Sequence, residues 1–119
     1  MTGEISACIS PQVLSEFFAV VTNRRRVSST LTQQEATDQI RKYYESEGLA
    51  IIYPGTRIVE RMLSLLERYA VTGPYIHDLR LVATMLENGV TRIYTFNVRD
   101  FAPFSEIDVL TPPEPTLTL

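Results

Sequence analysis

Residues 75–101 read YIHDLRLVATMLENGVTRIYTFNVRDF and show the secondary-structure pattern on which the predicted fold rests. The first half of this stretch predicts an amphipathic helix over about residues 76–88, with Gly89 at its end. The inward positions recur at helical spacing: Leu79, Val82, Ala83 and Leu86. Residues 91–95 then predict a strand, which a loop follows. The stretch is therefore a helix followed by a strand, the repeating unit of an α/β protein.

The rest of the chain alternates strands and helices in the same way. Strands are predicted over residues 5–9, 49–53 and 107–110. Helices are predicted from about 11 to 26, from a capping box at Thr32–Glu35 to Gly48, and from Thr56 to Gly73. The third of these is expected to turn one stripe inward: Ile58, Val59, Met62, Leu63, Leu66, Tyr69 and Ala70. This order predicts an α/β domain with a mainly parallel sheet over residues 1–112, followed by a flexible, proline-rich tail, residues 113–119.

Composition bounds the class of protein. The chain has 119 residues, which is enough for one domain with a hydrophobic core. Its net charge of −3 gives no indication that the surface as a whole binds nucleic acid. The single cysteine, Cys8, permits no internal disulfide, fits a reducing cytoplasm and is predicted to be a buried thiol. No apolar stretch approaches the roughly 20 residues that span a bilayer. A cytoplasmic protein is expected.

Three carboxylates stand at places where an α/β fold collects ligands. Glu16 and Asp78 fall in the first turns of predicted helices, and Asp100 falls just past a strand. Ligands gather beyond the carboxyl ends of parallel strands, so the three acids can meet at one edge of the sheet. Oxygen donors there suit Mg²⁺ or Mn²⁺, and a cation would offset the mutual repulsion of the carboxylates. Each acid alone also fits a structural role, as a charge at a helix terminus or as a turn residue.

Three segments together resemble the PIN domain family: SPQVLSEF at residues 10–17, HDLRLVATM at 77–85 and TFNVRDF at 95–101. The resemblance implies a three-layer α/β sandwich and a Mg²⁺- or Mn²⁺-dependent endoribonuclease of the kind found in toxin–antitoxin pairs. It implies catalytic roles for three acids: Glu16, Asp78 and Asp100. The metal ligands implied are the same acids and Asn97, with Thr95 orienting water or phosphate.

The resemblance departs from the family at the front of the chain. PIN domains open with a strand ending in a further aspartate and two helices, ahead of the strand that residues 5–9 resemble, so an N-terminally truncated PIN-like fold is expected. This leaves open an alternative, a catalytically inactive PIN-derived module that binds an antitoxin or another PIN subunit. A missing central strand also predicts direct pairing of residues 5–9 with 91–95, or a homodimer that completes the sheet. The expected partners are therefore RNA, a cognate antitoxin and a second copy of the chain.

Further polar and aromatic residues carry weaker signals. Arg24 and Arg25 belong to the one basic run, which fits either a solvated helix end or contact with RNA phosphates. His77, next to Asp78, is either a bystander or a substrate contact. Tyr43 and Tyr44 are predicted to pack in the core rather than to stack on bases.

Overall fold

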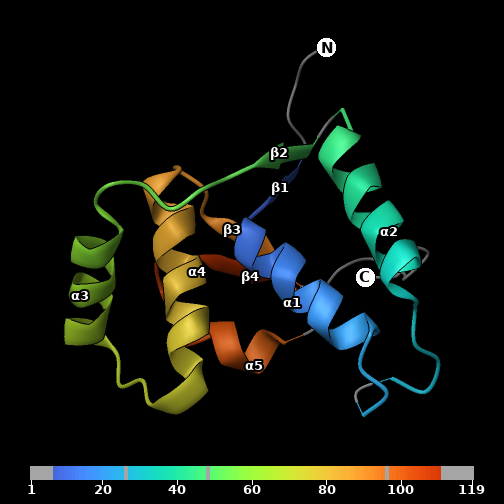
Figure 1. Ribbon diagram of the computed structural model, residues 1–119. Helices are drawn as coiled ribbons and strands as arrows, with labels where there is room; N and C mark the ends of the chain where they lie inside the picture. The colour runs from blue at the N-terminus through green and yellow to red at the C-terminus, as the bar shows by residue number, and fades with distance from the viewer. Residues whose placement is uncertain (1–6, 26, 48, 96, 111–119) are drawn as a thin grey trace. The chain divides into compact units, whose positions relative to one another are not determined.

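The computed structural model of the protein (Figure 1) describes residues 7–25, 27–47, 49–95 and 97–110. The chain divides into two compact units, Met1–Ile52 and Tyr53–Leu119. Each unit contains helices and one pair of parallel strands. The predicted class, mixed α/β with parallel strands, is therefore confirmed. The predicted limits of the domain and of its tail stay a prediction, and residues 111–119 lie outside the described part.

The first unit is built on two short strands. β1 (Ala7–Ile9) pairs in parallel with β2 (Leu49–Ile51), with Cys8 opposite Ala50. Two helices, α1 (Pro11–Val21) and α2 (Gln33–Glu45), form the connection between these strands. The described strands fall within the predicted ranges, and residues 5 and 6 lie outside the description.

Local capping chemistry fixes where the two helices begin. The buried Ser10 hydroxyl accepts a hydrogen bond from the N–H of Val13 at 3.3 Å, with Pro11 next to it in the first turn. The Thr32 hydroxyl accepts from the N–H of Glu35 at 3.1 Å, and the Glu35 carboxylate accepts from the N–H of Thr32 at 2.9 Å. The capping box predicted for α2 is thus confirmed.

The end of α1 was predicted too late. The helix ends at Val21 rather than near Arg26, because side chains beyond it satisfy the backbone in other ways. The Thr22 hydroxyl donates to the carbonyl of Phe18 at 2.7 Å, and the Asn23 side chain accepts from the N–H of Arg25 at 2.9 Å. This local turn competes with the helix, as short polar side chains commonly do.

Two predictions of burial in the first unit were wrong. Cys8 is exposed, since the alternation of a strand turns it to the face opposite that of the half-buried Ile9. Tyr44 is also exposed, whereas its neighbour Tyr43 is half-buried and packs edge-on against Phe17, with ring centroids 6.4 Å apart. Burial raises the pKa of Tyr43. Only one of the two tyrosines therefore belongs to the core.

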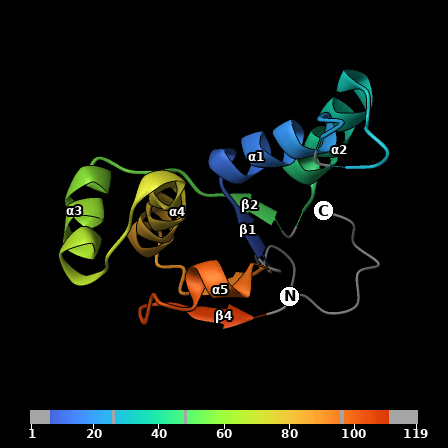
Figure 2. The ribbon, with the colours of Figure 1, turned by 90° about the horizontal axis from the view of Figure 1, so that it is seen from below.

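The second unit contains a helical hairpin and a second strand pair (Figure 2). Helix α3 (Ile58–Arg68) leads through the short 3₁₀ helix η1 (Gly73–Tyr75) into α4 (Ile76–Glu87). β3 (Arg92–Tyr94) pairs in parallel with β4 (Asp108–Leu110), and the short helix α5 (Val98–Phe101) lies between them in the chain. This α5 falls in a region that the sequence predicted to be a loop. A pairing of β1 with β3 would join the two units and stays a prediction.

Helix α4 forms the core of the second unit. Six of its twelve residues are buried: Leu79, Leu81, Val82, Ala83, Thr84 and Met85. The predicted inward face is confirmed for Leu79, Val82 and Ala83, and Leu86 is half-buried. Gly89 follows the cap residue Asn88 and has φ +70°. This is the left-handed backbone conformation that commonly ends an α-helix and that glycine adopts easily.

Helix α3 packs on α4 along a stripe that matches the predicted one only in part (Figure 1). Leu65, which was not predicted, is its buried residue, and the predicted Ile58 and Met62 are half-buried. The other predicted residues of this helix are exposed: Val59, Leu63 and Leu66. The helix is apolar over two adjacent stripes, and α4 covers the one that contains Leu65. Hydropathy alone could not choose between them.

Candidate active site

Asp78 lies in the first turn of α4 and is half-buried. Gly73, with φ +59°, and Pro74 form the turn that breaks the chain after α3 and starts α4 in a new direction. A carboxylate in the first turn is stabilised by the unpaired N–H groups and the positive end of the helix dipole. The predicted position of Asp78, near the start of a helix, is therefore confirmed, while its role stays a prediction.

Hydrogen bonds join Thr95, at the carboxyl end of β3, to Asn97 and Asp100. The N–H of Thr95 donates to the carbonyl of Leu110 at 2.9 Å, which extends the pairing of β3 with β4 by one bond. The Thr95 hydroxyl then accepts from the N–H of Asn97 at 2.9 Å, and the carbonyl of Asn97 accepts from the N–H of Asp100 at 3.1 Å. Thr95 thus shapes the turn that carries Asn97 and Asp100, a local role in addition to the predicted one.

Helix α5 holds Asp100 close to the core of the second unit. Phe101, next to it in the chain, is buried, as are Phe104 and Ile107. Two backbone hydrogen bonds continue from this helix, from Phe104 N to the Phe101 carbonyl at 3.0 Å and from Ile107 N to the Phe104 carbonyl at 3.3 Å. Asp100 itself is half-buried, whereas Asn97 is exposed.

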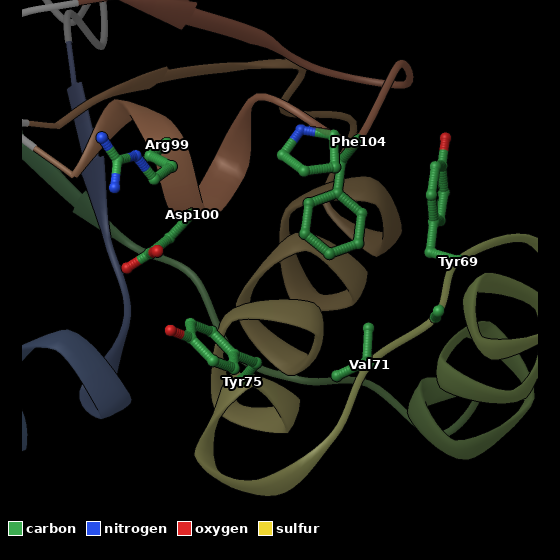
Figure 3. Close-up of a pocket in the computed structure, with 8 residues that line it drawn as sticks. Tyr69, Val71, Tyr75, Arg99, Asp100 and Phe104 are labelled. Carbon is green, nitrogen blue, oxygen red and sulfur yellow. The ribbon is translucent and has the colours of Figure 1, made fainter.

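A pocket of about 250 Å³ lies between the segment that joins α3 to α4 and the segment formed by α5 and the residues after it (Figure 3). Eight residues line it: Tyr69, Ala70, Val71, Tyr75, Arg99, Asp100, Pro103 and Phe104. Figure 3 shows Asp100 extending from α5 toward Tyr75, which directly precedes α4. Asp78 lies three residues after Tyr75, outside the residues that line the pocket.

Tyr69 is a fixed wall of this pocket. Its hydroxyl donates to Glu106 Oε1 at 2.7 Å and lies 2.9 Å from the Ser105 Oγ, and its ring meets Phe104 edge-on at a centroid distance of 5.0 Å. Arg68 holds the other oxygen of Glu106 at 2.6 Å and places its guanidinium 5.7 Å from the Tyr69 ring centroid. This network gives the pocket a rigid aromatic side.

Glu16 lies in the first unit, apart in the chain from the other two acids. It is exposed in α1, and its Oε2 accepts a hydrogen bond from Gln12 Nε2 at 3.3 Å. Arg24 and Arg25 are exposed in the turn that follows α1. The predicted site of three acids therefore draws on both units, and its assembly stays a prediction.

The oxygen donors in the second unit fit a hard divalent cation. Asp78, Asp100 and the amide of Asn97 offer the carboxylate and carbonyl ligands that Mg²⁺ and Mn²⁺ take in proteins. Within either unit, the described residues contain no group of three or more His, Cys, Asp or Glu side chains placed to share a metal ion. The acids of the second unit alone therefore supply only part of the predicted ligand set, and Glu16 would have to join them.

Of the eight residues that line the pocket, sequence reasoning proposed only Asp100 as a site residue, and the residues it missed include Tyr75, Arg99 and Phe104. Tyr75 is 55% exposed, and Arg99 is exposed next to the candidate acid. Tyr75 precedes Asp78 by three residues and Arg99 adjoins Asp100, so proximity in sequence was the available signal. His77 is exposed in the first turn of α4, and its two interpretations both stay open.

The family assignment rests on a match that covers most of the chain. The sequence model of the PIN domain family matches residues 2–109 of the chain. The chain therefore belongs to this family of metal-dependent nucleases. PIN domains generally bind divalent metal ions, which agrees with the oxygen donors described above. No curated protein matches the chain. Among the described residues, no helix is both long and apolar enough to cross a membrane.

Proposed function

We propose that the protein is a metal-dependent endoribonuclease of the toxin PIN type, which hydrolyses phosphodiester bonds in RNA. The observation that supports this proposal is the pocket lined by both Tyr75 and Asp100, because Tyr75 directly precedes α4, whose first turn carries Asp78. Membership of the PIN family supplies the chemistry expected of acids in these positions. A cognate antitoxin and a homodimer are the expected protein partners, on the strength of the resemblance alone.

The residues divide into distinct roles. Asp78, Asp100 and Asn97 would hold Mg²⁺ or Mn²⁺, with Glu16 as the fourth ligand from the first unit. A cation bound there would activate water and neutralise the charge that develops on the phosphate. Thr95 keeps Asn97 and Asp100 in place through the turn it stabilises. Arg24 and Arg25 are exposed cations that would contact RNA phosphates.

Cleavage of a labelled single-stranded RNA with and without Mg²⁺ or Mn²⁺ tests the proposal. The wild-type protein should cleave only with the cation, and Asp78→Asn should lower the rate by about two to three orders of magnitude. Asp108→Asn is a matched control, since Asp108 is an exposed carboxylate in β4 of the same unit. A wild-type protein without any cleavage would instead favour the inactive PIN-derived binding module.

A further inference from the structure

The pocket beside Asp100 has a composition that the proposed hydrolysis does not require. Acids and an amide suffice to hold a metal ion, but this pocket adds two tyrosines, a phenylalanine and an arginine. Phe104, 4% exposed, forms an apolar wall, and Tyr69 is held edge-on against it. Tyr75 contributes a solvent-exposed ring at the other side of the pocket (Figure 3). The pocket is therefore shaped by aromatic rings, with charge confined to Arg99 and Asp100.

The size of the pocket limits what it can hold. Pockets for drug-sized ligands measure about 300–1,000 Å³, so a volume of about 250 Å³ suits a single ring system rather than a whole cofactor. An aromatic wall favours a flat, polarisable group that can stack, and the charged residues favour a group with polar edges. A nucleobase has each of these properties.

We propose that this pocket is a nucleobase subsite, in which one unpaired base of single-stranded RNA stacks on Tyr75 while Arg99 contacts an adjoining phosphate. This inference rests on the proposed function, because it supplies a substrate contact for the same site. With its base held beside Asp100, the RNA backbone passes the start of α4, where Asp78 lies. The subsite thereby selects unpaired RNA and positions a neighbouring phosphodiester bond at the acids.

Hydrogen bonds among the surrounding side chains hold the aromatic wall in position, which supports a preformed subsite. The hydroxyl of Tyr69 donates a hydrogen bond to Glu106 at 2.7 Å. The same hydroxyl accepts a hydrogen bond from the backbone N–H of Ser105 at 3.1 Å. Arg68 secures Glu106 from the other side at 2.6 Å. These contacts keep the aromatic wall in place before RNA arrives, so binding would not have to order it. The exposed Tyr75 ring is then the surface left for stacking.

Binding of a short labelled oligoribonucleotide, measured by fluorescence anisotropy in EDTA, tests the subsite without cleavage. Tyr75→Ala should weaken binding by between about 5-fold and about 150-fold, the range for loss of one stacked base. Tyr75→Phe should bind as the wild type does, because it keeps the ring. Tyr53→Ala is the matched control: Tyr53 is 58% exposed in the same unit, against 55% for Tyr75, and lies outside the pocket.

The probe can be altered to isolate the base from the phosphate. An abasic oligonucleotide of the same length should bind the wild type and Tyr75→Ala equally, and an RNA duplex should bind more weakly than the single strand. Arg99→Gln should lower the slope of log affinity against log salt by about 0.7, the value for one phosphate of a single strand. Arg61→Gln, an exposed arginine on α3, should leave this slope unchanged.

The outcomes separate the subsite from the nuclease. Tyr75→Ala binding as tightly as the wild type, or an abasic strand binding as tightly as the intact one, would overturn the subsite even if the protein cleaves RNA. Base-dependent binding that Tyr75→Ala weakens supports the subsite even if no cation produces cleavage, in which case only the proposed hydrolysis fails. A folded Tyr75→Ala protein, confirmed by circular dichroism, is required for either reading.

Discussion

The Glu87 carboxylate, at the end of α4, accepts a hydrogen bond from the backbone N–H of Gly55 at 2.8 Å. Its other oxygen accepts from the N–H of Arg57 at 3.1 Å, just before α3 begins. Arg57, the cap residue of α3, makes no side-chain capping bond of its own. The Glu87 carboxylate on α4 therefore caps the start of α3 and links the two helices of the hairpin.

Loss of this cap should lower stability by a measurable amount. Glu87→Ala removes both hydrogen bonds, so we expect the free energy of unfolding to fall by about 0.5–2 kcal/mol, the range for loss of an N-cap. Urea unfolding followed by circular dichroism measures the change. Glu67→Ala, an exposed glutamate on α3, is the control and should stay within about 0.5 kcal/mol of the wild type.

A double-mutant cycle would show that Gly55 and Glu87 act as a pair. A methyl group at Gly55 would lie 2.8 Å from Glu87 Oε2, so Gly55→Ala should displace the carboxylate and lose the same bonds. Gly55→Ala should then cost less stability in a Glu87→Ala background than in the wild type. Equal costs in the two backgrounds would contradict this account.

Tyr69→Phe should destabilise the second unit while keeping its aromatic packing. The change removes the hydroxyl that donates to Glu106 and accepts from the N–H of Ser105, but it leaves the ring against Phe104. We expect a loss of about 1–3 kcal/mol in the free energy of unfolding, because the half-buried Glu106 loses a partner. Thermal unfolding measures it, with Tyr53→Phe as the control at an exposed tyrosine. A Tyr69→Phe protein as stable as the wild type would show that water replaces these bonds at no cost.

The features predicted correctly from sequence are those that local chemistry decides. Ser10 and Thr32–Glu35 cap the helices that follow them because the donor and acceptor lie within three residues of each other. The alternation of strands and helices likewise predicts parallel pairing, since the connections are long. Asp78 could likewise be placed near the start of its helix, because the Gly73–Pro74 break before that helix is visible in the sequence.

The features that sequence missed depend on contacts between distant parts of the chain. Helix α5 has four residues, too few for any periodic pattern to show. The buried stripe of α3 is set by the position of α4, and both stripes of α3 are apolar, so Leu65 was not distinguished from Leu66. Tyr75 becomes a pocket residue only because α5 approaches the start of α4.

Alkaline pH should destabilise the protein in part through Tyr43. Burial raises the pKa of Tyr43 above its ordinary value of 10.0, because the phenolate is poorly solvated there. The stabilising contribution is fully present below pH 10.0, where the ring is neutral in both states. As pH rises further, the unfolded chain releases its proton first, so the free energy of unfolding falls until the pH passes the raised pKa of the folded state.

Substitutions at two neighbouring tyrosines can test this pH dependence. Tyr43→Phe should lose less stability than the wild type between about pH 9 and about pH 11, as measured by urea unfolding. Tyr44→Phe is the matched control and should follow the wild type, because Tyr44 is 67% exposed. Identical pH dependence in the wild type and in Tyr43→Phe would contradict the prediction.

Divalent cations should stabilise the folded protein if the acids form one metal site. At Mn²⁺ concentrations about 100 times the dissociation constant, binding adds about 2.7 kcal/mol to the free energy of unfolding. Differential scanning calorimetry should therefore show a higher melting temperature with Mn²⁺ for the wild type. Asp78→Asn and Asp100→Asn should reduce this increase, and the control Asp108→Asn should keep it. The measurement needs no RNA and no cleavage.

The same titration decides whether Glu16 belongs to the site. Glu16 lies in the first unit, so Glu16→Gln should lose part of the Mn²⁺ stabilisation only if the two units bring it to Asp78 and Asp100. Glu35 and Glu45 are exposed glutamates of the same unit, and Glu45→Gln serves as the control because Glu35 belongs to a capping box. A Glu16→Gln protein that gains as much from Mn²⁺ as the wild type would remove Glu16 from the ligand set. A wild type that gains nothing would refute the metal site as a whole.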